Sequence, residues 1–259
     1  MRRSDKMHGV FGKPARVGAS VLLAASLVAA ASAPALAVNG GACNRPYAPG
    51  IQADDFRDGA GHPNPIDNLY FPLEPGTTFR YVGTKDAAAL VDVMTVTGST
   101  KPIMGVMARV VRDSAYENGI LVEDTFDWYA QDDAGNVWYC GEDTRELDAQ
   151  GNVTSTEGSW QAGDGPNLPG ILMKAHPAAG VTYRQEYAPD VAVDMATGIS
   201  IHRHISVPYG SLAKVLETKE FSCIEKTIDH KFYAPGVGLI RELAVANGRE
   251  DTALVSKTP

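Results

Sequence analysis

The sequence predicts an all-β fold in which an antiparallel meander closes into a barrel or a barrel-like sandwich. Three observations predict it: turn signals recur about every ten residues, apolar and polar residues alternate between them, and helical periodicity is nearly absent. This spacing gives ten or eleven strands after residue 79. Closing the sheet removes the exposed strand edges on which other chains would otherwise pair.

The first 37 residues have the pattern of a signal peptide. Basic residues up to Arg16 precede a charge-free apolar run, 17–37, which ends with small residues at Ala35 and Ala37. This ending predicts cleavage before Val38, and it favours removal of the run over its retention as a membrane anchor. We therefore expect an exported protein, secreted or periplasmic, with no membrane span after cleavage.

The charge balance bears on the class of partner. Residues 38–259 hold 18 basic and 30 acidic residues, a net charge of −12. A nucleic-acid-binding protein normally carries a basic patch, so this composition argues against nucleic acid as a partner. The hydrophobic content of 44% excludes wholesale disorder.

The positions of turn-forming residues along the chain predict its organisation. Residues 38–65 are rich in Gly, Pro, Asn and Asp, and we expect an irregular N-terminal arm followed by a single β domain over 66–259. Asn118-Gly119 and Asn247-Gly248 each separate two apolar runs, which is the strongest short signal for a hairpin. Gly and Pro are dense between 157 and 180, which predicts a long loop that serves as a lid, a rim or a partner surface.

Two further turns share one formula, Asp-x-x-Gly-Asn-Val, beginning at Asp132 and at Asp148. The Asp side chain can cap such a turn and the Gly supplies a positive φ, so turns of a meander are favoured over calcium loops. Alternation predicts strands over Val181–Tyr187 and Ile199–Val207, and the best short helix candidate is Asp190–Ala196.

The three cysteines leave an odd thiol in an oxidising compartment. One disulfide and one leftover thiol is the simplest arrangement. Cys140 and Cys223 both lie in strand-like stretches, so their pairing is favoured, and pairing of Cys43 with either of them is the alternative.

Candidate ligand-binding residues concentrate in the hairpin between residues 121 and 145. Its first strand carries Glu123, Asp127 and Tyr129 on one face and Trp128 on the other, and Trp138 follows the turn. Aromatic rings beside acids suit a sugar or an organic cation, through stacking and cation–π contacts. The competing interpretation is ordinary aromatic pairing across strands, with solvated acids.

Histidines give a weaker signal. His202 and His204 share one strand face and can chelate zinc with a third ligand, but His230 falls on an apolar face of its own strand. No metal site and no cofactor are therefore predicted. His230 is retained as a candidate ligand-binding or acid–base residue. Motifs of serine hydrolases, nucleotide-binding folds and zinc proteases are absent from the sequence.

Several runs carry a family resemblance. DTFDWYAQD from Asp124, GNVWY from Gly135 and KFYAPGVGL from Lys231 resemble an uncharacterised family of secreted bacterial β-rich proteins. The resemblance covers most of residues 68–241 and implies an exported β-rich protein. It implies no activity, so no catalytic residues can be transferred from it. The barrel predicted from the strand pattern is similar in outline to the lipocalins.

Three function hypotheses follow from these observations. The first is a binding protein that holds a small amphiphilic or sugar-like ligand in a barrel mouth lined by Glu123, Asp127 and the nearby aromatic residues. The second is an exported hydrolase or lyase that uses Glu123, Asp127 or His230. The third is an envelope-associated structural or interaction module that uses the 157–180 loop, with its partner protein unspecified.

Overall fold

The computed structural model describes residues 40–259, and the predicted signal peptide, residues 1–37, lies outside the described residues. Helix is confined to the four-residue α1 (Gly40–Cys43) and the 3-10 helix η1 (Ala53–Phe56) within this range. Neither of these helices has the length and apolar character needed to cross a membrane.

The remaining elements of the described range are strands. In chain order they are β1 (Thr78–Lys85), β2 (Ala88–Ile103), β3 (Val106–Glu117), β4 (Ile120–Gln131), β5 (Val137–Leu147), β6 (Val153–Ser155), β7 (Trp160–Gln161), β8 (Leu168–Met173), β9 (Thr182–Arg184), β10 (Glu186–Tyr187), β11 (Asp194–Val207), β12 (Gly210–Ser222), β13 (Ile228–Ala234), β14 (Gly238–Ala246) and β15 (Glu250–Thr258).

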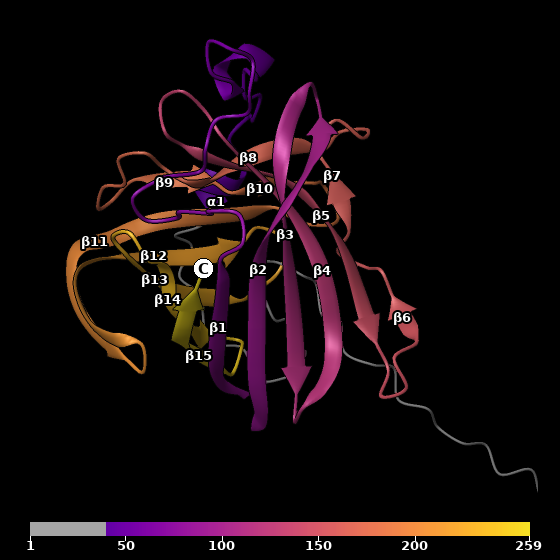
Figure 1. The fold of residues 1–259 in the computed structure, drawn as a ribbon, viewed down its shortest axis with the longest axis vertical. Helices are drawn as coiled ribbons and strands as arrows, with labels where there is room; N and C mark the ends of the chain where they lie inside the picture. Colours follow the sequence, from indigo (N-terminus) through magenta and orange to yellow (C-terminus); the bar gives the residue numbers. More distant parts are fainter. Residues whose placement is uncertain (1–39) are drawn as a thin grey trace, which may run out of the picture.

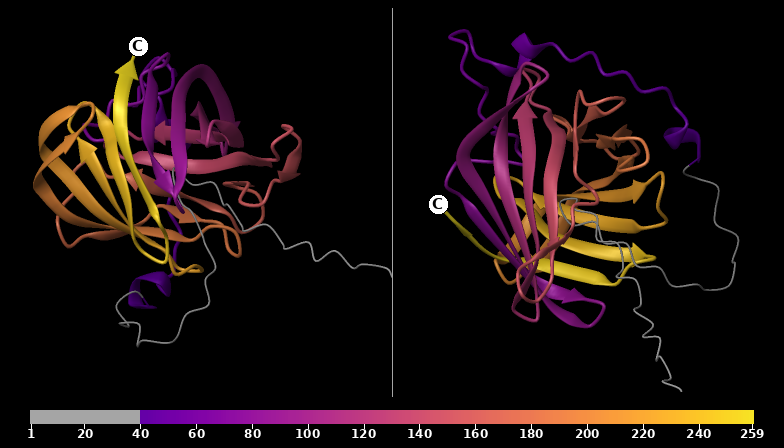
Figure 2. Two further views of the ribbon diagram at one scale, coloured as in Figure 1. Left: turned by 90° about the horizontal axis from the view of Figure 1, so that it is seen from below. Right: turned by 90° about the vertical axis from the view of Figure 1, so that its right-hand side faces the viewer.

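All the strand pairs are antiparallel, and they form one sheet that nearly closes on itself. The order along the sheet is β10-β8-β5-β4-β3-β2-β1-β15-β14-β13-β12-β11-β9. Pairing of β1 with β15 joins the two halves of the meander. The two ends of the path, β9 and β10, are separated in sequence by Gln185 alone. The predicted all-β barrel is confirmed, and Figures 1 and 2 show the β2–β5 half crossing the β11–β14 half.

The hairpin turns form where the sequence predicts them. Asn118 and Gly119 both adopt positive φ, 50° and 84°, between β3 and β4. This conformation matches the right-handed twist of the flanking strands. In the Asp132 turn, one carboxylate oxygen accepts the backbone N–H of Asn136 at 2.8 Å, and the Asp148 turn repeats this contact with Asn152 at 2.9 Å.

The region predicted as a loop, 157–180, contains two strands, and the short helix candidate at 190–196 gives way to the start of β11. β8 pairs with both β5 and β10, so Pro and Gly occur here inside the sheet. At Gly170 a side chain would meet the carbonyl oxygen of Gln185 at 2.0 Å. Gly170 lowers the strand propensity of this segment, but it is required because the backbone of Gln185 approaches too closely for a side chain.

The core is an apolar and aromatic layer inside the barrel. Phe71, from the segment before β1, packs its ring against Tyr129 of β4 and Tyr233 of β13, with centroids 5.4 and 6.4 Å apart. Asn68 holds this segment in place, because its side chain accepts the N–H of Tyr70 and donates to the carbonyl of Gly135. The segment therefore covers one end of the barrel interior.

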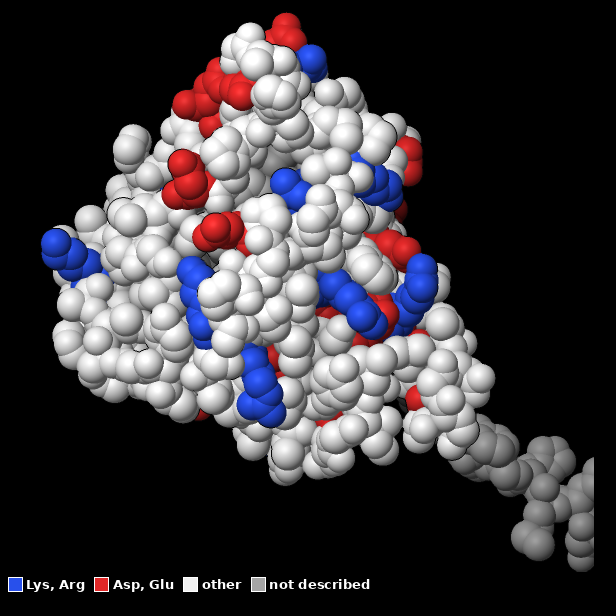
Figure 3. Space-filling view, in the orientation of Figure 1, with Lys and Arg blue, Asp and Glu red and all other residues white. Residues whose placement is uncertain are grey.

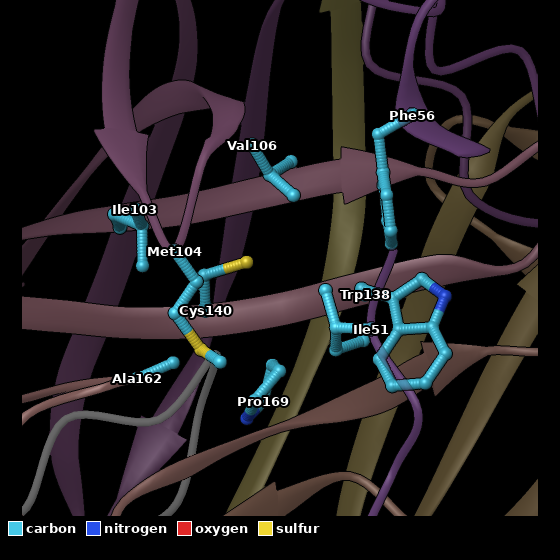
Figure 4. Close-up of a pocket in the computed structure, with 9 residues that line it drawn as sticks. All are labelled: Ile51, Phe56, Ile103, Met104, Val106, Trp138, Cys140, Ala162 and Pro169. Carbon is cyan, nitrogen blue, oxygen red and sulfur yellow. The ribbon is translucent and has the colours of Figure 1, made fainter. Parts of the chain in front are cut away.

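The disulfide differs from the favoured prediction. Cys43 pairs with Cys223, with Cα atoms 5.6 Å apart, whereas Cys140 is buried in β5 and outside the disulfide. The physical reason is that the arm carries Cys43 to the end of β12. Cys140 lies on another wall, beside a cavity of about 10 Å³ that it lines with Ile51 and Phe56 of the arm (Figure 4).

Breaking the Cys43–Cys223 bond should destabilise the protein. The cross-link spans 180 residues, and loss of a native disulfide typically costs about 2–5 kcal/mol of unfolding free energy. We expect Cys43→Ser and Cys223→Ser to lower the urea midpoint and Cys140→Ser to retain the cross-link. Burial raises the pKa of Cys140 to about 12, so a thiol reagent should label one thiol only after denaturation. A Cys140–Cys223 peptide in a non-reducing digest would contradict this arrangement.

Candidate functional site

The interior faces of β4 and β5 bring together a compact polar patch. Asp127 and Glu142 lie directly opposite each other in the strand register, and Tyr129 lies opposite Tyr139. Asp127, Glu142, Tyr129 and Tyr139 are each at most 1% exposed. The mixed face expected from the sequence therefore points into the barrel.

Hydrogen bonds satisfy only part of this patch. Tyr139 donates its hydroxyl to Oδ1 of Asp127 at 2.6 Å, and the hydroxyls of Thr125 and Thr144 lie 2.6 Å apart beside it. The second oxygen of Asp127, Oε2 of Glu142 and the hydroxyl of Tyr129 have no hydrogen-bond partner among residues 40–259. Buried polar atoms are normally paired, so these three neighbouring atoms require a separate explanation.

A larger set of carboxyl groups surrounds this patch. Its members face the barrel interior from the inward positions of their strands and feel one another's charge: Asp92, Asp113, Glu123, Asp127, Glu142, Glu186, Asp194, Glu220, Asp229, Glu242 and Glu250. We call this set the interior acid cluster.

One lysine partly balances the interior acid cluster. Nζ of Lys231 in β13 lies 3.2 Å from Oε2 of Glu220 and 3.5 Å from Oε2 of Glu242. Burial opposes protonation of Lys231, but the charges of Glu220 and Glu242 outweigh it and raise its pKa. Tyr233 also donates its hydroxyl to Glu220, at 2.9 Å. This side of the interior therefore holds ion pairs, although Oε2 of Glu242 and Oε1 of Glu250 have no hydrogen-bond partner among residues 40–259.

Burial raises the pKa values of the remaining acids. Burial raises the pKa of Asp127 well above its ordinary value and the charge of Asp113 adds to the shift, whereas the Tyr139 hydrogen bond opposes it. Burial likewise raises the pKa of Glu142, with the charges of Glu186 and Asp127 adding to the effect. Burial raises the pKa of Asp92 too, with the charge of Asp113 adding to the effect, and neither carboxylate oxygen of Asp92 has a hydrogen-bond partner among residues 40–259.

An aromatic layer borders the patch on one side. The rings of Tyr129 and Tyr139 are 5.0 Å apart, and Trp160 contacts Tyr139 edge-on at 5.7 Å. The indole N–H of Trp160 donates to Glu186 at 3.2 Å. The interior therefore offers both stacking surfaces and hydrogen-bond acceptors, a combination typical of small-molecule sites.

Of the six ligand-binding residues predicted from sequence, the structure gathers three. Glu123, Asp127 and Tyr129 share the interior face of β4, and Glu123 accepts the Thr125 hydroxyl at 3.1 Å. Trp128 lies on the opposite face, where Nζ of Lys101 is 3.2 Å from its ring centroid.

Trp138 and His230 are also outside the interior. Trp138 donates its indole N–H to Asp132 at 2.8 Å and packs edge-on against Phe56 of the arm, as Figure 4 shows. His230 projects from the outer face of β13, where its Nδ1 lies 2.8 Å from Oε1 of Glu217. The structure therefore places Trp128, Trp138 and His230 apart from the interior patch, and the ligand-binding role of all six residues stays a prediction.

Sequence reasoning missed most of the interior acid cluster because it assumed that apolar strand faces point inward. In β13 Asp229 and Lys231 are buried on one face, and the opposite face carries His230, which is 28% exposed, and Phe232, which is buried. One signal was available in the sequence: an acid that takes the place of an apolar residue in the alternating pattern of a strand. Asp92, between Leu90 and Met94 in β2, is an example. No group of three or more potential ligands in residues 40–259 is arranged to hold a metal ion.

Comparisons with known proteins give one distant structural likeness. No protein-family model and no curated protein matches the chain. A solved structure from Parabacteroides distasonis ATCC 8503, described as a putative lipoprotein, is similar with a TM-score of 0.41 and 12% identity, over 74% of this chain and 99% of that one. The secreted family inferred from the sequence runs is not identified by these comparisons.

The acid cluster predicts a particular dependence of stability on pH. The pKa of Glu123 is raised to about 7, mainly by burial and then by the charge of Asp113. The unfolded value is about 4, so the folded state binds this proton more tightly. The resulting stabilisation is fully present below pH ~4 and is lost as pH rises towards 7. The unfolding free energy of Glu123→Gln should therefore gain about 3 kcal/mol relative to that of the native protein between pH 4.5 and 7.5.

Urea unfolding at the two pH values measures this difference. Glu74→Gln, which changes an exposed carboxyl, is the matched control and should track the native protein at both pH values. If the unfolding free energies of Glu123→Gln and the native protein change equally between the two pH values, Glu123 has the same pKa in the folded and unfolded chains.

Proposed function

We propose that this is an exported binding protein that holds a small amphiphilic ligand inside the barrel, with the donor-rich polar part of the ligand against the β4–β5 patch. An organic amine fits this patch best, and a sugar-like ligand is the next candidate. The proposal rests chiefly on the three unsatisfied atoms of Asp127, Tyr129 and Glu142.

Unsatisfied buried acceptors favour a ligand that donates hydrogen bonds. Leaving such an atom unpaired costs about 1–3 kcal/mol, and more when the group is charged. An ammonium group or sugar hydroxyls would supply donors to Asp127 and Glu142. A cation would also offset the excess of acids over Lys231, because opposite charge favours the ionised carboxylates.

The aromatic layer supplies the apolar half of such a site. Tyr129, Tyr139 and Trp160 present ring surfaces beside the acids, and aromatic faces attract both cations and the apolar faces of sugars. The Cys43–Cys223 disulfide supports export, because such bonds persist in oxidising compartments. The predicted signal peptide points the same way, to a secreted or periplasmic location.

Ligand binding should depend on the interior patch and not on the outer face. Native mass spectrometry of exported protein comes first, followed by calorimetric titration with spermidine, choline and maltose. For the ligand that binds, the double variant Asp127→Asn/Glu142→Gln should weaken affinity by about 10-fold or more, since charge-assisted hydrogen bonds contribute about 1.5–3 kcal/mol each.

His230→Ala is the matched control, because His230 lies on the outside of β13 and should leave the affinity unchanged. If no titrant binds and no retained mass is released on denaturation, the interior is not a site for these ligand classes. An equal loss on His230→Ala would move the site to the outer face.

One observation favours a second function, an exported glycoside-type hydrolase. Asp127 and Glu142 are directly opposed, and opposed positions in a sheet place Cβ atoms about 4.5–5.5 Å apart. A carboxyl pair at about 5 Å with one raised pKa is the arrangement of a retaining mechanism. On this alternative, Asp127→Asn would reduce turnover of an aryl glycoside by about 100-fold or more, whereas a binding protein shows no turnover to lose.

A further inference from the structure

A second cavity lies between the segment that precedes β1 and strands β2 to β4. Its volume is about 530 Å³, within the range of small-molecule pockets. The lining includes Phe56, Ile66, Leu73, Thr100, Met107 and Arg109. We call it the arm cleft. It shares Tyr129 with the interior patch but none of the interior carboxyl groups.

The arm wall of the cleft is held in place before any ligand arrives. Asn64 donates its side-chain amide to the carbonyl of Gln131 at 3.3 Å and to Asp133 at 2.9 Å. Gln131 in turn accepts the backbone N–H groups of Asp67 and Asn68. Four prolines of the lining add rigidity, because their φ angles are fixed. A preformed wall lowers the entropic cost of binding.

Arg109 supplies a cation to this cleft. The register of β2 against β3 shifts between Val96 and Thr100. Nη1 of Arg109 donates to the carbonyls of Thr97 and Ser99, both at 3.3 Å. These bonds orient the guanidinium, and no carboxylate of residues 40–259 forms an ion pair with it. A guanidinium with remaining donors suits a bidentate carboxylate.

The two acids of the cleft lining, Asp67 and Glu74, limit the ligand to a single negative charge. Asp67 is engaged by the side-chain amide of Gln131 at 2.6 Å, and Glu74 lies exposed at the rim. Figure 3 shows acidic and basic side chains interspersed over the face of the molecule that it draws, without a continuous field of one sign. Recognition here therefore depends on contact with Arg109 and not on long-range attraction.

The apolar part of the lining indicates the rest of the ligand. Phe56 and Leu73 are buried at the base of the cleft, and Met107 is 41% exposed beside Arg109. Methionine adapts its shape to varied apolar partners. We propose that the arm cleft binds an amphiphilic organic monocarboxylate, with the carboxylate on Arg109 and the apolar chain on Met107, Phe56 and Leu73.

Decanoate is a suitable probe, titrated calorimetrically below its aggregation concentration. We expect saturable binding of one decanoate, weakened at least 10-fold by Arg109→Gln. Met107→Glu changes an exposed side chain of the wall, and it should weaken decanoate to the same extent by placing a like charge beside the ligand. Arg112→Gln is the matched control, because Arg112 lies on the same strand but pairs with Asp124 at the surface. Its affinity for decanoate should stay within 2-fold of that of the native protein.

Two further titrations separate this site from the interior one. In the first, 1-decanol and decyltrimethylammonium should bind the native protein at least 10-fold more weakly than decanoate does. In the second, the double variant Asp127→Asn/Glu142→Gln should bind decanoate with the affinity of the native protein. The proposal is overturned if decanoate does not saturate, if Arg109→Gln and Met107→Glu bind it normally, or if decanol binds equally well. Loss of decanoate binding in the interior double variant would also overturn it, by moving the ligand into the barrel.

Discussion

Placing many carboxyl groups inside a nearly closed sheet is the constraint on which the rest of this structure depends. Each buried acid must be protonated, paired or hydrogen-bonded, because an isolated buried charge is too costly to keep. The described interior meets this demand in part by two kinds of contact. Lys231 pairs with Glu220 and Glu242, and tyrosine hydroxyls donate to Asp127 and Glu220.

The aromatic layer and the acid cluster depend on each other. Tyr139 and Tyr233 fill the apolar part of the core with their rings and deliver their hydroxyls to the acids below. A phenylalanine at position 139 would keep the packing and remove the hydrogen bond to Asp127, whereas Glu220 would keep Lys231 and Thr218 if Tyr233 were replaced. Around Asp127, Tyr129 and Glu142 this compensation is incomplete, so the same chemistry that stabilises one side of the interior leaves acceptors for a ligand on the other.

The segment before β1 has two roles that follow from one placement. Its buried face, with Phe71, covers one end of the aromatic core, and the wall beyond it forms the arm cleft against β2–β4. The Cys43–Cys223 disulfide fastens the start of the arm to the end of β12 on the far half of the sheet. The segment before β1 therefore contacts the interior patch through Phe71 and forms one wall of the arm cleft.

The sequence by itself determined the all-β class, the hairpin turns at Asn118-Gly119 and Asp132, and the shared face of Glu123, Asp127 and Tyr129. These features depend on local backbone preferences and on the two-residue period of a strand, both of which are visible in sequence. Only the tertiary structure decided which face of each strand points inward, because sheet closure turned charged faces such as that of β13 towards the interior. It also decided the cysteine pairing, the strand role of β8 and the cleft at Arg109, since each depends on contacts between segments far apart in the chain.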